Sequence, residues 1–256
     1  MSFFNKVLAS IGIGAATVDT KLEKDQVVPG EEIKGIVDIR GGNVEQQIDD
    51  IYLSINTQYI KESDDKKYYA TETIERIRLA STLTLAANER REIPFSFQLP
   101  LDTPVTVGKT KVWVTTGLDI KNAVDPSDKD FLHVKPNRLL EGVIDSISSL
   151  GFRLREVECE QASRSLRGRL PFIQEFEFVP TSGVFRGRLD ELELVFLPTS
   201  QTSADLHFQI DRKARGLKGF LSEALEMDET NIRSSISISD LATFPQKLRI
   251  LLQKYA

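Results

Sequence analysis

The sequence is poor in the residue types on which most catalytic and metal sites depend. Its 256 residues include one cysteine, Cys159, and two histidines, His133 and His207. A lone cysteine forms no intramolecular disulfide, and a cysteine nucleophile requires a base beside it. Two isolated histidines and a distant cysteine do not make a transition-metal site. We therefore expect no enzyme activity, no bound metal and no cofactor.

Long apolar runs and excess positive charge are also missing. No stretch approaches the roughly 18 apolar residues of a membrane-spanning helix, and Lys6 interrupts the short apolar N-terminus, which lacks a signal-peptide layout. The net charge is −5. This value argues against a nucleic-acid binder, because affinity for phosphates requires a positive field. The sequence predicts a cytoplasmic protein with no nucleic-acid partner.

Strict alternation of apolar and other residues is the clearest pattern present. In IPFSFQLP, residues 93–100, the side chains of Ile93, Phe95, Phe97 and Leu99 point to one face of an extended chain. Prolines at positions 94 and 100 confine this strand to a sheet edge or a bend. Upstream, VVPGEEIKGIVDIRGG (residues 27–42) places Pro-Gly at the centre of a type II turn. Both segments are typical of a β-sandwich.

The remainder of the first half repeats this design. Short strand patterns follow one another from residue 18 to residue 136 without helical periodicity, and KESDDKK (residues 61–67) predicts a solvated hairpin tip. The strand pattern stops at VKPN, so we place a domain boundary after Pro136. Asn137 is then the expected N-cap of a helix near 138–150. Further short helices are predicted over residues 2–11, near 216–227 and near 244–255.

Three segments together resemble a known family. They are the PGE turn with its following G-x-V-x-I, the PFSFQLP strand, and VDPSDKDFLHVKP at residues 124–136; the stretch IDRKARGLKGFLSEALEMDE at 210–229 adds to the likeness. The sequence resembles the bacterial sporulation-control proteins, which have an arrestin-like fold. The resemblance implies a mainly β chain with two tandem arrestin-like (immunoglobulin-like) β-sandwiches, residues 1–136 and 137–256, and a few short helices.

The resemblance also implies a function. The family members are binding proteins without catalytic residues to carry over, so we expect a non-enzymatic scaffold or regulator that controls sporulation through protein–protein interaction. The implied partner is a signalling or cell-envelope component. Peripheral contact with the inner face of the membrane stays open as a second mode of attachment, and the sequence determines neither the identity of the partner nor the oligomeric state.

Arginine clusters in the second half have two interpretations. RGRL occurs at residues 167–170 and again at 186–189, and each copy precedes alternating glutamates. In paired strands, the arginines would form cross-strand ion pairs with Glu175, Glu177, Glu191 and Glu193, each contributing roughly 0.2 to 1 kcal/mol. Alternatively, the arginines form an exposed anion-binding patch.

A second group of basic residues supplies the candidate site for a partner or for the contact between the domains. These residues interrupt the strand alternation after residue 210 or lie on the amphipathic C-terminal helix: Arg212, Lys213, Arg215, Lys247, Arg249 and Lys254. They would attract an acidic partner or anionic lipid. Arg212 has a further interpretation, in which it bridges the domains through Asp125 or Asp128.

Aromatic and acidic residues offer weaker alternatives. A small-ligand or carbohydrate-binding sandwich would require an aromatic platform, for which Trp113, Tyr68 and Tyr69 are the candidates. The acidic run DPSDKD (residues 125–130) lacks the glycine and distal glutamate of a calcium-binding EF-hand loop, so we interpret it as a turn.

Overall fold

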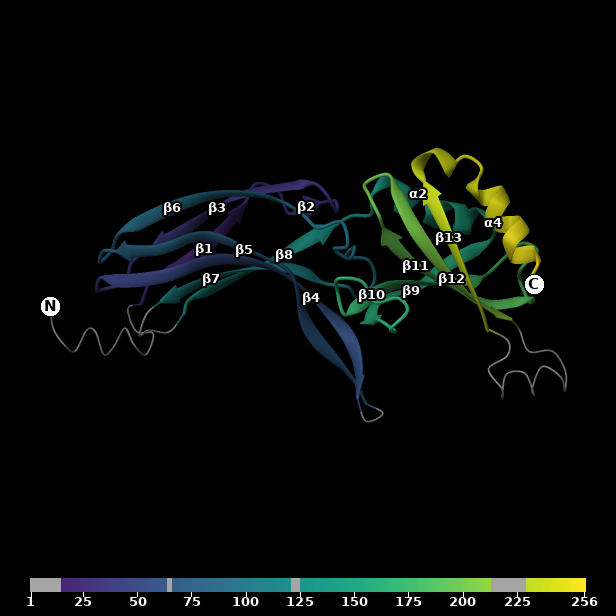
Figure 1. Cartoon of the computed structure of the whole chain (residues 1–256), viewed down its shortest axis with the longest axis horizontal. Coiled ribbons are helices and arrows are strands. Elements are labelled where there is room, and N and C mark those ends of the chain that lie inside the picture. The colour runs from purple at the N-terminus through teal and green to yellow at the C-terminus, as the bar shows by residue number, and fades with distance from the viewer. Residues whose placement is uncertain (1–14, 64–65, 121–124, 213–228) are drawn as a thin grey trace. The chain divides into compact units, whose positions relative to one another are not determined.

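The computed structural model describes residues 15–63, 66–120, 125–212 and 229–256 (Figure 1). The chain is mainly β, as the sequence predicts. It divides into two compact units: unit 1 contains residues 1–58, 71–106 and 111–134, and unit 2 contains residues 59–70, 107–110 and 135–256. The sequence pattern marks one boundary, after Pro136, whereas this division also assigns residues 59–70 and 107–110 to unit 2.

Unit 1 contains two sheets that enclose an apolar core. The first sheet has the antiparallel order β1-β3-β6, formed by β1 (Thr17–Leu22), β3 (Glu32–Arg40) and β6 (Arg90–Gln98). The second has the order β5-β4-β7-β8-β2, formed by β2 (Gln26–Val27), β4 (Gln46–Ser63), β5 (Lys66–Leu85), β7 (Val112–Ile120) and β8 (Ser127–Val134). Buried side chains from both sheets, such as Ile33 and Leu53, fill the core.

The strand β6 has the predicted register. Phe95 and Leu99 are buried, whereas the intervening Ser96 and Gln98 are exposed. Gly30 adopts the positive φ of 87° that the predicted turn requires, and its N–H donates to the carbonyl of Leu99 at 2.8 Å. Gly35 of β3 lies against the Phe95 ring: a Cβ atom there would approach Cζ of Phe95 to 2.6 Å. Only glycine fits beside this ring.

Unit 2 is built on five antiparallel strands in the order β13-β12-β11-β10-β9, and the end of β4 continues this sheet through a parallel pairing of Ile60 with Glu160 of β9. The strands are β9 (Phe152–Gln161), β10 (Phe172–Pro180), β11 (Leu189–Pro198), β12 (Ser203–Arg212) and β13 (Glu229–Ser237). The helices are α2 (Arg138–Ser149), the 3-10 turn η1 (Ile238–Asp240) and α4 (Phe244–Gln253). In the described part of unit 2, the layer that covers the sheet consists of α2 and α4.

Both described helices match predicted ones. The side chain of Asn137 caps α2 by accepting the N–H of Leu140 at 2.9 Å. Val143 of α2 and Leu248 of α4 are buried, and α2 contacts both β9 and α4. The helices predicted over residues 2–11 and near 216–227 fall outside the described residues.

The buried face of the unit 2 sheet agrees with the alternation in the sequence. Phe176, Phe178, Leu192 and Leu194 each have at most 1% of their surface exposed. In a strand, successive side chains point to opposite faces. The glutamates that alternate with these residues therefore point to the other face of the sheet.

We predict that Phe95→Ala lowers the free energy of unfolding of unit 1 by about 3 to 5 kcal/mol, because it leaves a cavity beside Gly35. Trp113 is the single tryptophan and lies buried in β7, so its fluorescence during urea denaturation reports on unit 1. Gln98→Ala, on the exposed face of the same strand, serves as the control. Equal denaturation midpoints for the two variants would exclude this register.

Candidate functional site

The basic residues that the sequence singles out have different positions. Arg212 ends β12, and its side chain, like all of Lys213 and Arg215, lies outside the described residues, so that patch stays a prediction. Lys247 contacts Asp240, with 3.0 Å between Nζ and Oδ1, and thereby links α4 to η1. The side chains of Arg249 on α4 and of Lys254, its C-cap residue, are exposed.

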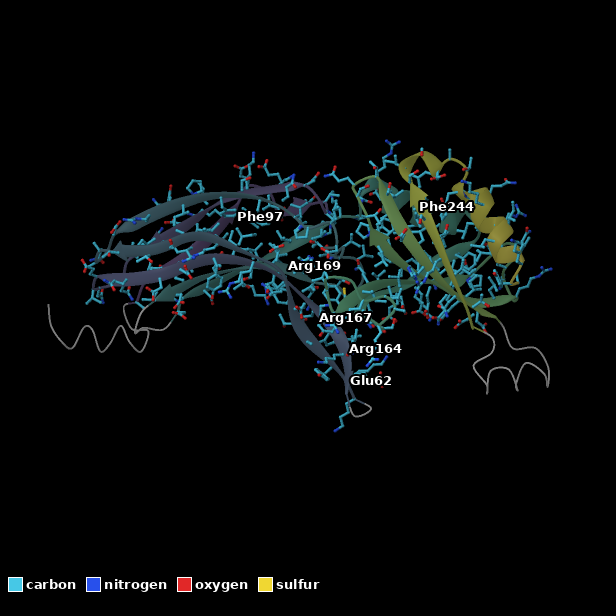
Figure 2. All side chains as sticks on the ribbon, viewed as in Figure 1. Glu62, Phe97, Arg164, Arg167, Arg169 and Phe244 are labelled. Carbon is cyan, nitrogen blue, oxygen red and sulfur yellow. The ribbon has the colours of Figure 1, made fainter. Side chains whose placement is uncertain are left out.

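The prediction of cross-strand pairs by the RGRL arginines was wrong. Residues 167–170, among them Arg167 and Arg169 (Figure 2), lie in the loop between β9 and β10. Residues 186–188 lie in the turn before β11. The second RGRL turns because Gly187 has a positive φ of 75°. The ion pairs of Glu177 and Glu191 are instead made by Arg155 of β9.

The acidic run at residues 125–130 also differs from its prediction as a turn. Asp128 and Asp130 belong to β8. Asp128 Oδ2 accepts the N–H of Thr20 at 2.7 Å, which ties β8 to β1 within unit 1. Burial and the neighbouring Asp128 raise the pKa of Asp130 to about 6. Asp125 accepts the N–H of Ile120 at 2.9 Å.

The main cluster of titratable side chains lies on the face of the unit 2 sheet that points away from the buried one. We call it the acidic face and define it by eight carboxylates on four strands: Glu156, Glu158, Glu160, Glu175, Glu177, Glu191, Glu193 and Asp211. The sequence predicted that the glutamates of β10 and β11 would point outward, and the structure extends this row to both neighbouring strands.

Strand register places like charges directly opposite one another on this face. Four acidic pairs are direct cross-strand partners: Glu156 with Glu177, Glu158 with Glu175, Glu177 with Glu193, and Glu191 with Asp211. Side chains so paired lie about 5 Å apart at Cβ, and like charges in that position destabilise a sheet. The opposed carboxylates of the acidic face therefore lower the stability of the sheet, and the fold does not require them.

Two cations offset part of this cost. Nζ of Lys109 lies 2.5 Å from Oε1 of Glu156 and 2.8 Å from Glu158. Gly108 presents this lysine with a positive φ of 64°, and a Cβ atom on it would meet the carbonyl oxygen of Val157 at 2.8 Å. Arg155 bridges β10 and β11 by contacting Glu177 and, at 2.5 Å, Glu191.

Sequence reasoning missed both Lys109 and Arg155. Lys109 is 47 residues from Glu156, and Arg155 is 36 residues from Glu191, so no local spacing connects them. The alternating glutamates of REVECEQ, residues 155–161, could have predicted that this strand continues the row of outward-pointing carboxylates. Their period of two matches that of the EFE and ELE segments in β10 and β11.

Glu175 and Glu193 have no ion pair among those described, and both have raised pKa values. Burial, reinforced by Glu160 and Glu191, raises the pKa of Glu175 to about 7, although Lys67 opposes the shift. Burial, with the negative charges of Glu175, Glu191 and Asp211, raises the pKa of Glu193 to about 8. Burial is the largest cause for both groups, so at pH 7 Glu193 is mainly protonated and Glu175 is about half protonated.

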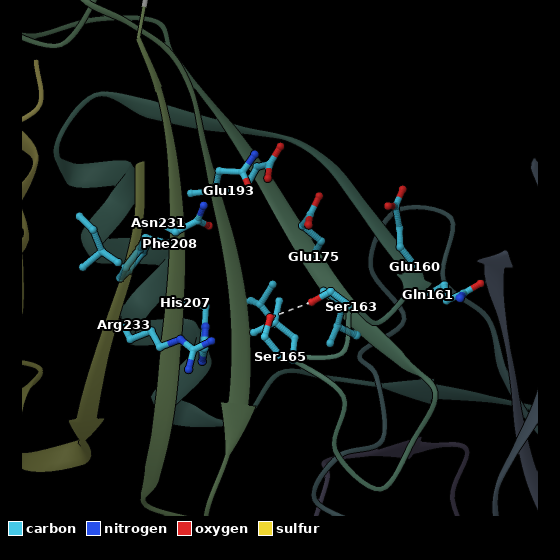
Figure 3. Close-up of a pocket in the computed structure, with 15 residues that line it drawn as sticks. Glu160, Gln161, Ser163, Ser165, Glu175, Glu193, His207, Phe208, Asn231 and Arg233 are labelled. Carbon is cyan, nitrogen blue, oxygen red and sulfur yellow. Dashed lines mark hydrogen bonds between the residues drawn. The ribbon is translucent and has the colours of Figure 1, made fainter. Parts of the chain in front are cut away.

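A pocket of about 630 Å³ opens on the acidic face beside these two glutamates (Figure 3). Its apolar lining includes Ile173, Val195 and Leu166, which belong to a cluster with Ala162 and Leu197. His207 and Arg233, cross-strand partners on β12 and β13, line another part of the wall. The pocket thus combines proton-holding carboxylates with an accessible apolar surface.

The chemistry open to these groups is limited. The hydroxyls of Ser163 and Ser165, which flank Arg164 in the loop, lie 3.1 Å apart and bond to each other rather than to a base. Cys159 is buried, and desolvation raises the pKa of its thiol to about 12. Such a thiol is not a nucleophile at physiological pH.

Three carboxylates of the acidic face could act as ligands for a hard cation. Oxygens of Glu191, Glu193 and Asp211 lie within 4.8 Å of one another. Calcium takes six to eight oxygen ligands, so three half-buried carboxylates supply an incomplete set. Binding of a cationic side chain fits the same arrangement, as Arg155 already shows by contacting two carboxylates of neighbouring strands.

We predict that unit 2 loses stability as the pH rises from 4.5 to about 8. Between these values the folded chain holds a proton on Glu193 that the unfolded chain has released, so raising the pH favours unfolding. Glu193→Gln keeps the neutral shape and should raise the melting temperature above about pH 8 while changing it little near pH 5. Differential scanning calorimetry, with Trp113 fluorescence to identify the transition of unit 1, measures this effect.

The control for this prediction is Glu156→Gln on the same face. The pKa of Glu156 is lowered, chiefly by its hydrogen bond to Lys109, so its neutralisation should bring no gain in stability at high pH. If both variants shifted the melting temperature equally, the buried negative charge of Glu193 would not be the cause.

Comparison with known proteins identifies the family. Residues 4–214 match the family model described as SpoOM protein. The sporulation-control protein Spo0M of Bacillus subtilis strain 168 is 46% identical over 259 residues, covering 100% of both chains. The crystal structure of Spo0M from Bacillus subtilis superposes with a TM-score of 0.85 at 45% identity, covering 95% of this chain and 100% of that one. The chain therefore belongs to the Spo0M family of sporulation-control proteins.

Proposed function

We propose that this member of the family controls sporulation as a non-enzymatic scaffold that binds a protein partner. The observation that carries this proposal is the acidic face of unit 2. Its directly opposed carboxylates reduce the stability of the sheet, and an open apolar pocket lies among them. Residues that destabilise a fold and surround a pocket are typical of a binding surface.

The scarcity of reactive groups supports binding rather than catalysis. Cys159 is protonated and buried, and His133 belongs to unit 1, where its ring lies 3.3 Å from the hydroxyl of Thr106. His207 lies in the pocket, but burial and Arg233 lower its pKa. The lowered pKa weakens His207 as a base, and the nearby serines bond to each other.

The alternative of a carbohydrate-binding sandwich lacks support from the aromatic side chains. Trp113 has 6% of its surface exposed, and Nζ of Lys129 lies 4.1 Å from its ring centroid. Tyr68 and Tyr69 are exposed, but as neighbours in β5 they point to opposite faces. Neither arrangement offers a flat, open platform for a sugar ring.

We place the protein in the cytoplasm, attached to its partner by unit 2. Among the described helices, none has the length and apolar character to cross a bilayer. Phe244, Leu248 and Leu252 of α4 are buried within unit 2, which leaves Ile250 as the one large apolar side chain of this helix that is exposed. The acidic face would be repelled by anionic lipids. These observations favour a protein partner over direct membrane contact.

We predict that the double variant Cys159→Ala with His133→Gln keeps full control of sporulation, because neither side chain takes part in binding. Complementation of a Bacillus subtilis strain that lacks its own spo0M, followed by counting of heat-resistant spores, measures this. Differential scanning calorimetry, which detects the unfolding of both units, confirms that the variant is folded. A folded double variant that failed to restore the parental spore count would contradict a scaffold role and indicate catalysis.

A further inference from the structure

The acidic face has the chemistry of a receptor for guanidinium groups. Arg155 places its guanidinium between Glu177 of β10 and Glu191 of β11. A planar guanidinium presents donors in several directions, so it can bond to carboxylates of two strands at once. The guanidinium of Arg155 thus has carboxylates of two neighbouring strands as its counter-charges.

A second pair of carboxylates, Glu175 and Glu193, stands on the same two strands. Glu177 is the direct cross-strand partner of Glu193, and Glu175 is its diagonal neighbour. In the part of the chain that the structure describes, no ion pair joins Glu175 or Glu193 to a resident cation. Figure 3 shows both carboxylates on the strands that border the pocket. Glu175 and Glu193 thus stand in the same diagonal relation across β10 and β11 as Glu177 and Glu191, which flank Arg155.

The apolar floor determines what kind of cation fits. Ile173 and Val195 lie on the same face as Glu175, and Val195 is its direct cross-strand partner. A bare cation would bind the carboxylates without covering these side chains, whereas a peptide segment carries apolar groups beside its charges. A pocket of about 630 Å³ has room for such side chains.

We propose that the acidic face binds an arginine-bearing segment of a protein partner, with a guanidinium held between Glu175 and Glu193 and an apolar side chain on Ile173 and Val195. This inference rests on the proposed scaffold function and adds the surface and the chemistry of the partner. Charge complementarity selects the partner, and the apolar contact adds affinity once water is displaced.

Binding is coupled to proton release. The charged groups that face the site come from every neighbouring strand: Lys67, Glu158, Glu160, Glu177, Glu191, Asp211, His207 and Arg233. Burial, together with this excess of acidic neighbours, raises the pKa of Glu175 to about 7 and that of Glu193 to about 8. An arriving guanidinium stabilises their ionised forms and expels those protons. A purely structural role for these residues would produce no such release.

The test uses the full chain and a short fluorescent peptide in which arginine and leucine alternate. The double variant Glu175→Gln with Glu193→Gln should bind the peptide about tenfold more weakly at low salt. The variant should remain folded, because glutamine reproduces the neutral form of each acid. The control variant neutralises two exposed glutamates of unit 1, Glu23→Gln with Glu45→Gln. It should bind the peptide with the affinity of the parent chain.

Calorimetry in two buffers of different ionisation enthalpy supplies the second measurement. The parent chain should release protons on binding, and the Glu175→Gln with Glu193→Gln variant should release fewer. A peptide with lysine in place of arginine should bind several-fold more weakly, since an ammonium group lacks the planar donor array. Equal peptide affinity in the parent and the double variant, or absence of proton release, overturns the proposal.

The same variants also distinguish two other occupants of the acidic face, which are a second copy of the chain and a segment of the chain itself. Concentration-dependent self-association that the double variant abolishes would assign the face to a second copy of the chain. If the peptide bound only after residues 213–228 were removed, the occupant of the acidic face would be that segment of the same chain. Either result overturns the proposal. Failure at this surface leaves the scaffold function standing if the Cys159→Ala with His133→Gln variant still complements, so the two hypotheses fail separately.

Discussion

The antiparallel register of β9, β10, β11 and β12 is the constraint on which the functional surface depends. Register fixes which side chains meet, and a shift of one residue would send every glutamate to the buried face. The phenylalanines and leucines on that face hold the register in place, because Phe178, Leu192 and Leu194 are fully buried. The apolar core therefore maintains the opposed carboxylates that electrostatics alone would separate.

The apolar core explains why unit 2 stays folded despite the opposed carboxylates of its acidic face. Burial of one large apolar side chain contributes roughly 1.5 to 3 kcal/mol, whereas a like-charge pair across two strands costs less than about 1 kcal/mol. Arg155 and Lys109 reduce the cost at Glu177 and Glu156. Protons reduce it at Glu175 and Glu193, for which the described residues supply no ion-pair partner. The protonated pair is consequently the part of the face best prepared for a cationic ligand.

Much of the fold could be predicted from sequence because its signals are local. The Pro-Gly turn before β3, the alternation in β6 and the capping by Asn137 each depend on residues a few positions apart. The outward direction of Glu175, Glu177, Glu191 and Glu193 follows from alternation in the same way. Signals of this kind are independent of how distant segments pair.

The candidate site could be predicted only in part, since its electrostatics depend on pairing between distant segments. RGRL suggested arginine partners for the glutamates, but a turn glycine removes the second copy from the strand, and a loop contains the first. The cations that do pair, Lys109 and Arg155, come from a loop and from a strand whose neighbours the sequence does not reveal. Burial of Glu193, which raises its pKa, likewise requires three-dimensional coordinates.

The protonation state of the acidic face is the most direct test of this account. Carbon-13 NMR of the side-chain carboxyls, assigned with the Glu175→Gln and Glu193→Gln variants, follows the titration of each group. We expect midpoints of about 7 for Glu175 and about 8 for Glu193, with both midpoints lowered when the arginine-containing peptide is added. Midpoints near the ordinary value of 4.5 for both groups, unchanged by the peptide, would contradict it.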